Sequence, residues 1–91
     1  MGEAAFTVQG VGIMAHQRDA GLAAMKGQFR ASDVASALLR AGVPQHSEAK
    51  VWPRPLSADY IPERAADRLL QAERKAGRIR AVNNKVWERT A

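Results

Sequence analysis

The 91-residue sequence contains no cysteine, and aromatic residues make up only 5% of it. The absence of cysteine excludes a disulfide framework, a thiolate zinc site and a cysteine nucleophile, and it fits a reducing compartment. No apolar run approaches the length of a membrane span, and the N-terminus lacks the charged region and apolar block of an export signal. A cytoplasmic protein is therefore expected by elimination.

The usual sequence marks of catalysis are also missing. The chain has no Ser/His/Asp arrangement, no glycine loop that would hold a phosphate and no paired carboxylates in an evident pocket. His16 and His46 lie in different segments, and no ligand spacing joins them to Glu48 in a metal site. We therefore expect no enzymatic activity, no metal and no cofactor.

Apolar and basic residues dominate what is present. Apolar residues account for 46% of the chain, enough for one small folded domain. Fourteen Lys and Arg outnumber nine Asp and Glu, so the formal net charge is +5. Such a balance favours a polyanionic partner, which is a nucleic acid, an anionic membrane face or an acidic protein. Composition alone does not distinguish between these partners, so the positions of the charges in the sequence have to be considered.

The N-terminal third predicts an arm followed by a helix. Residues 1–10 are expected to form the arm, in which residues 6–8 are either a short strand or lie on the domain, and residues 11–91 form the single domain. A helix is predicted from about residue 11 to residue 26, because its apolar residues recur at helical spacing: Val11, Met14, Ala15, Leu22 and Met25. Gly27 is suited to end that helix.

The stretch "GQFRASDVASALLRAG" predicts a second, short helix, entered through an extended segment at Phe29. Ser32 and Asp33 are favourable helix-start residues, and Gly42 suits the left-handed cap, with Pro44 beyond it as a stop. One apolar stripe is expected along this helix, formed by Ala31, Val34, Ala35, Leu38 and Ala41.

Residues 43–60 contain three prolines and show no hydrophobic period, so they predict a long ordered loop. Loops of this length in small domains often carry function. Trp52 within it is either a core anchor or an exposed contact residue, and the anchoring role is favoured.

A third helix is predicted from Pro62 to about Ala76, ended by Gly77. Its apolar face is expected to comprise Ala65, Ala66, Leu69, Ala72 and Ala76. A second face carries four polar side chains at i, i+4, i+7 and i+11, namely Arg64, Arg68, Gln71 and Lys75. We call these four residues the basic edge.

The closing stretch "GRIRAVNNKVWERT" predicts a β-hairpin, because an Asn-Asn pair tolerates the positive φ of a tight turn. A two-residue turn would place Arg80 opposite Trp87, whereas a three-residue loop places Arg80 opposite Glu88. The second register is favoured, since it puts Ile79, Ala81 and Trp87 on one buried face and an Arg80–Glu88 pair on the wet face.

The order helix, helix, long loop, helix and hairpin, ending in "ERAADRLLQAERKAGRIRAVNNKVWERT", resembles the winged helix-turn-helix superfamily. The resemblance covers about residues 11–89 and implies a mainly α fold with a small β component, in which the C-terminal hairpin is the wing. It also implies that the third helix enters the major groove of double-stranded DNA while the wing lies along the backbone. The chain departs from the family in its long 43–60 loop, since the second and third helices are usually joined by a short turn.

This resemblance implies a small DNA-binding regulator, or an accessory factor in transcription, replication or phage DNA handling. Arg64, Arg68 and Gln71 would face base edges, because Arg pairs with guanine and Gln with adenine. Phosphates would be held by the remaining cations, which are Lys75, Arg78, Arg80 and Lys85. Binding would then weaken with added salt.

Two other interpretations remain open. The basic edge alone is equally typical of a solvated helix face. The same scaffold also suits a protein-interaction module or an inhibitor that docks through the 43–60 loop, with Trp52, Arg54 and Tyr60 as contact residues. A palindromic DNA target would in addition require a homodimer.

Overall fold

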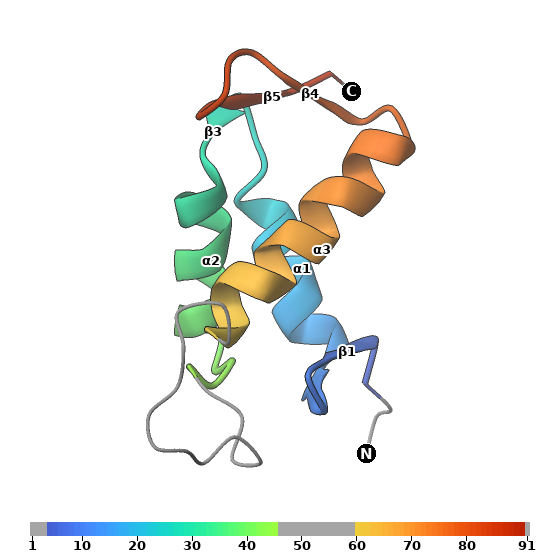
Figure 1. Ribbon diagram of the computed structural model, residues 1–91, viewed down its shortest axis with the longest axis vertical. Coiled ribbons are helices and arrows are strands. Elements are labelled where there is room, and N and C mark those ends of the chain that lie inside the picture. The colour runs from blue at the N-terminus through green and yellow to red at the C-terminus, as the bar shows by residue number, and fades with distance from the viewer. Residues whose placement is uncertain (1–3, 46–59, 91) are drawn as a thin grey trace.

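Three helices and two small antiparallel sheets make up residues 4–45 and 60–90, the part of the chain that the computed structural model describes (Figure 1). The mainly α composition with a small β component matches the expectation. In chain order the elements are β1 (Phe6–Val8), β2 (Val11–Ile13), α1 (Ala15–Ala23), β3 (Gln28–Phe29), α2 (Ala31–Arg40), α3 (Ile61–Lys75), β4 (Ile79–Ala81) and β5 (Trp87–Arg89). Most of the predicted 43–60 loop, including Trp52 and Arg54, lies outside the described residues. Within the described part, no helix combines the length and the apolar character that crossing a membrane requires.

The N-terminal segment forms a hairpin, and the prediction of a helix beginning at Val11 is wrong. β1 pairs with β2 around a turn at Gln9 and Gly10, both of which have positive φ (51° and 82°). Helix α1 begins only at Ala15. The predicted boundary between the arm (residues 1–10) and the domain (residues 11–91) falls at this turn. Val8 from β1 and Ile13 from β2, on either side of the turn, both lie in the same hydrophobic core.

Helix α2 forms where it was predicted, but it begins at Ala31, before the expected start residues Ser32 and Asp33. The Arg30 backbone N–H donates to the Asp33 carboxylate at 2.9 Å, which satisfies one free donor at the helix start. Gly42, with φ 102°, ends the helix in the left-handed conformation as expected. The predicted stripe is buried at Val34, Ala35 and Leu38, whereas Ala31 is exposed.

The core lies where the three helices cross. Helix α3 crosses the front of the molecule in Figure 1, with α1 behind it and α2 beside it. Gly21 of α1 permits this approach, because a Cβ there would lie 2.9 Å from Leu69 and 3.1 Å from Leu38. Of the apolar face predicted for α3, Ala65, Ala66 and Leu69 are buried, but Ala72 and Ala76 are exposed.

The C-terminal hairpin (β4, β5 and the turn between them) joins β3 in a sheet of order β3-β5-β4. The favoured register is confirmed, since Arg80 lies opposite Glu88 and Ala81 opposite Trp87. Ile79 is buried and Trp87 packs against the core, whereas Ala81 is exposed, contrary to the prediction. The Asn-Asn turn also forms differently from the prediction, because neither asparagine has positive φ.

Candidate nucleic-acid interface

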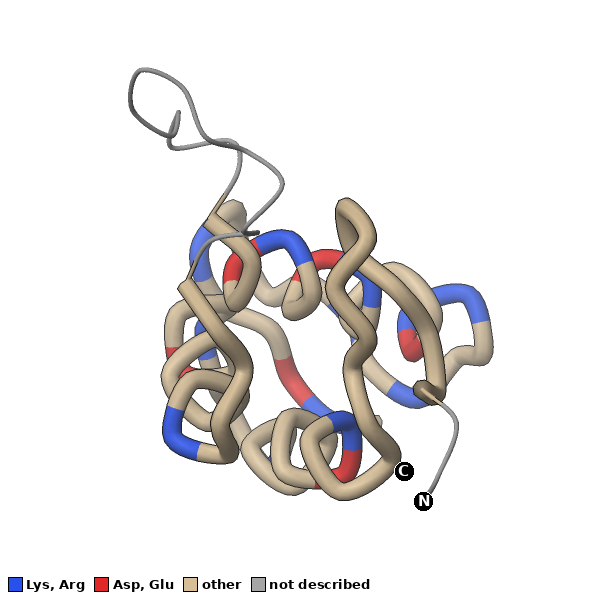
Figure 2. The backbone as a smooth tube through the Cα atoms, turned by 90° about the horizontal axis from the view of Figure 1, so that it is seen from below, with Lys and Arg blue, Asp and Glu red and all other residues tan. Residues whose placement is uncertain are grey.

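Basic residues occur on several elements of the protein, with acidic residues interspersed among them (Figure 2). Net charge alone therefore does not locate a binding surface. The contacts of each predicted cation decide whether its charge is available to a ligand or already balanced within the protein.

Arg64 and Lys75 are the two available cations of the basic edge. Both are exposed on α3, and neither makes an ion pair within the part of the chain that the structure describes. They stand eleven residues apart, which is three helical turns, so their side chains leave the helix on the same side. The basic edge therefore lies on the surface of the molecule, which is where a ligand-binding role requires it to be.

Arg68 has contacts of its own that the sequence did not reveal. Its guanidinium lies 5.6 Å from the centre of the Phe6 ring, and its Nη1 donates to the Thr7 carbonyl oxygen at 3.3 Å. A cation over an aromatic face is attracted by the ring quadrupole. Arg68 therefore ties the β1–β2 hairpin to the middle of α3.

Gln71, another candidate for base recognition, also makes internal hydrogen bonds. Its Oε1 accepts hydrogen bonds from Arg74 Nη2 at 2.9 Å and Arg74 Nε at 3.2 Å. The side-chain acceptor that would pair with adenine is thus already occupied by a neighbour on the same helix. Arg68 and Gln71 would therefore have to break internal contacts to bind a base, whereas Arg64, the third candidate for base recognition, would not.

The two arginines predicted to hold phosphates, Arg78 directly before β4 and Arg80 within it, are balanced by carboxylates. Arg78 forms a bidentate pair with Glu73, with Nη2 2.8 Å from Oε2 and Nε 3.1 Å from Oε1. Arg80 lies 3.1 Å from Glu88 across the hairpin. A balanced cation attracts a phosphate less than a free one, so these residues contribute less than the sequence suggested.

Lys85 is the available cation in the turn of the C-terminal hairpin. It is exposed and makes no ion pair with a described residue. The Asn83 side chain shapes the turn around it, because its Oδ1 accepts the backbone N–H groups of Lys85 at 2.8 Å and Val86 at 3.0 Å. The turn is thus held by a side-chain acceptor.

A buried carboxylate fixes the C-terminal hairpin to the helices. Glu73 is only 7% exposed, and it also accepts from Arg89 Nη1 at 3.5 Å, while Arg89 Nε donates to the Met25 carbonyl at 2.6 Å. Hydrogen bonding from Arg78 lowers the pKa of Glu73 against the opposing effect of burial, and Arg89 adds to the lowering. Glu73 is therefore an ionised anchor between α3, β5 and the segment after α1.

Sequence reasoning missed this anchor and the role of Phe6. A signal for Glu73 was present, because it follows Leu69 by four residues and Leu70 by three, which places it on the buried face of α3. A charged residue at such a position usually has a partner. Phe6 gave no signal, because its partner Arg68 is far away in sequence.

Of the three residues predicted to contact a protein partner, the structure describes only one. Trp52 and Arg54 lie outside the described residues, and Tyr60 is half-buried directly before α3. No group of three His, Cys, Asp or Glu side chains capable of holding a metal ion occurs within the described ranges.

Replacing Arg68 with alanine is expected to loosen the β1–β2 hairpin, because the cation–π contact and the hydrogen bond to Thr7 are both lost. The local opening free energy should fall by about 0.5–1 kcal/mol. Amide hydrogen exchange at Ala5, whose N–H donates to the Ile13 carbonyl at 2.7 Å, measures this opening. Arg64→Ala is the matched control, since it truncates the same edge without touching the hairpin. A hairpin that exchanges equally slowly in both variants would contradict the expectation.

Comparison with known protein families, with curated proteins and with solved structures finds no significant match to this chain.

Proposed function

We propose that this protein binds double-stranded DNA along its phosphate backbone, using the basic edge of α3 and the turn of the C-terminal hairpin. The observation that carries the proposal is the availability of Arg64, Lys75 and Lys85, which are exposed and unpaired among the described residues. Exposed cations on a helix edge and in a hairpin turn are side chains that typically contact DNA phosphates.

The order of the elements supports the same function. Three helices followed by a hairpin, with a short strand at Phe29 before α2, is the order that the winged-helix resemblance implies. The winged-helix assignment is part of this proposal, and it places the third helix and the hairpin against one duplex. A regulator or an accessory factor of DNA handling is the corresponding role.

Backbone contact, rather than base recognition, is the mechanism that these contacts favour. Arg68 and Gln71 are held by internal hydrogen bonds. Glu63 and Asp67 are exposed along the neighbouring flank of α3, where deep insertion into a groove would bring them close to phosphates. Docking on the basic edge keeps these carboxylates away from the DNA.

A fluorescence anisotropy titration with labelled duplexes of unrelated sequence tests the proposal. Three phosphate contacts predict that log K falls with log salt with a slope of about −2.7, since each contact contributes roughly −0.9. The dissociation constants of different sequences should agree within about threefold, because non-specific binding is sequence-independent. The absence of binding at low salt would refute the function. A strong preference for one sequence would refute only the backbone mechanism.

A further inference from the structure

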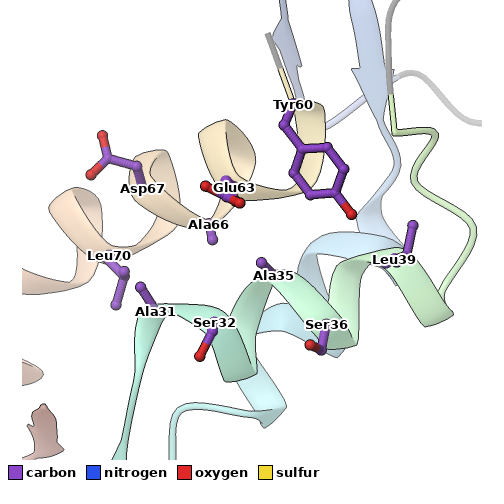
Figure 3. Close-up of a pocket in the computed structure, with 10 residues that line it drawn as sticks. All are labelled: Ala31, Ser32, Ala35, Ser36, Leu39, Tyr60, Glu63, Ala66, Asp67 and Leu70. Carbon is purple, nitrogen blue, oxygen red and sulfur yellow. The ribbon is translucent and has the colours of Figure 1, made fainter. Parts of the chain in front are cut away.

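A groove between α2 and α3 is not used by the proposed DNA contact. It encloses about 560 Å³ on the outer side of the two helices (Figure 3). Its floor is made of small side chains, namely Ala31 and Ala35 from α2 and Ala66 from α3. At one end lies Leu39, which is 37% exposed and is one of few large apolar side chains on the described surface. A floor of alanines lets another helix approach closely.

The charged side chains that the described residues place along this groove are all acidic. Glu63 and Asp67 line it from α3, and no Lys or Arg is among the described residues that line it. Both carboxylates are exposed, and neither makes an ion pair within the described ranges. On a chain with a net charge of +5, two neighbouring unpaired carboxylates beside an apolar floor favour a cationic occupant.

Arg74, a cation, lies on the same helix α3 as these two carboxylates. Arg74 follows Glu63 by eleven residues and Asp67 by seven, so all three side chains lie on one side of α3, which we call the outer flank. The outer flank is acidic in the first turn and basic in the last. When two copies of α3 lie antiparallel, the acidic end of one outer flank lies beside the basic end of the other, so the charges are complementary.

We propose that the groove is the contact face of a symmetric dimer, in which α3 of a second copy of this chain lies antiparallel across it. Each Glu63 then faces Arg74 of the second copy, and each Asp67 lies beside Gln71 of the second copy, whose side-chain amide has N–H groups to donate. The two-fold axis makes both contacts occur twice, as an isologous interface requires. The second copy also covers Leu39 and the alanine floor.

This arrangement leaves Arg64 and Lys75 of each basic edge accessible. Arg64 follows Glu63 by one residue and Lys75 follows Arg74 by one residue, a rotation of about 100° around the helix. When two antiparallel helices are related by a two-fold axis perpendicular to their plane, side chains rotated by a quarter turn project to the same side. Arg64 and Lys75 of both copies therefore face one side of the dimer. Formation of the dimer does not itself require nucleic acid.

Sedimentation velocity without nucleic acid, from about 10 µM to about 1 mM protein, measures the pairing. Glu63→Arg and Arg74→Glu are each expected to raise the dimer dissociation constant at least about tenfold, because each places like charges opposite one another. The double variant Glu63→Arg/Arg74→Glu restores opposite charges and should return the constant to within about threefold of wild type. Circular dichroism establishes that every variant is folded, and Glu63→Gln is the milder substitute for Glu63→Arg.

Asp19→Arg is the matched control, since it makes the same change in net charge at an exposed position on α1. It should leave the dissociation constant unchanged. A wild-type protein that stays monomeric throughout the range overturns the proposal. So does a dimer that is indifferent to both single reversals, or one that the double variant fails to restore. A monomer that binds a helical alanine–leucine–lysine peptide through Glu63 would assign the groove to a cationic partner protein instead.

Discussion

Replacing Arg64 and Lys75 together with glutamate is expected to weaken binding to duplex DNA at least about a hundredfold, as measured by fluorescence anisotropy at low salt. Each reversal removes a phosphate contact and adds a carboxylate that repels the backbone. Exposed Glu63 and Asp67 already lie on the neighbouring flank, so the reversed edge would join them in one continuous acidic surface. The salt dependence should shrink at the same time, because two fewer counterions are released.

A control must separate this local effect from the change in total charge. Each reversal lowers the formal net charge by two, so the double variant falls from +5 to +1. Arg18→Glu with Arg40→Glu produces the same net charge on α1 and α2, and neither residue belongs to the basic edge or the hairpin turn. This control should lose no more than about tenfold, since long-range attraction is screened within roughly 10 Å at moderate salt. Equal losses in the two variants would show that binding follows net charge and would remove the basic edge from the interface.

The parts of the fold that the sequence predicted correctly are those fixed by local signals. Helix α2 has a polar start at Asp33, a continuous apolar stripe and Gly42 after its end, and each signal acts within a few residues. The register of the C-terminal hairpin was predictable for a similar reason. The predicted pair of Arg80 with Glu88 is present in the structure, although the predicted alternation of buried and exposed side chains is not, since Ala81 is exposed.

The first strand pair escaped prediction because two periodicities compete in the same residues. Val11 and Met14 fit a helical repeat with later apolar residues, yet Val11 and Ile13 also alternate as strand residues do. The outcome depends on pairing with β1 through the Gln9-Gly10 turn, in which a non-glycine residue adopts positive φ. Glutamine is not a common residue for that conformation, so the turn carried little signal.

The candidate site was predictable in position but not in the state of its charges. Helical spacing correctly placed four side chains on one edge of α3. It did not predict that Arg68 bonds to Thr7, 61 residues earlier, or that Arg89 bonds to Met25, 64 residues earlier. Such distant contacts follow from the packing of the elements, and they determine which cations are available to bind a phosphate.

Replacing Glu73 with glutamine is expected to lower the free energy of unfolding by about 1–3 kcal/mol at neutral pH, since a buried acceptor of charge-assisted hydrogen bonds is lost. Arg78 and Arg89 would both lose their carboxylate partner, which weakens the attachment of the C-terminal hairpin to α3. Urea unfolding followed by circular dichroism measures the loss. Glu88→Gln is the matched control, because its pair with Arg80 is largely exposed and should contribute no more than about 1 kcal/mol.

The pH dependence of this difference tests whether ionised Glu73 is the cause. Hydrogen bonds from Arg78 and the charge of Arg89 hold its pKa below the ordinary value of 4.5, which the group regains on unfolding. A carboxyl whose pKa is lowered in the folded state stabilises the protein fully above the unfolded pKa, and this contribution is lost as the pH falls through the folded pKa. The difference between wild type and Glu73→Gln should therefore be constant from neutral pH down to about pH 5 and shrink at lower pH. A difference that persists unchanged in acid would mean that glutamine destabilises the protein through packing, and that the carboxylate charge does not hold the hairpin in place.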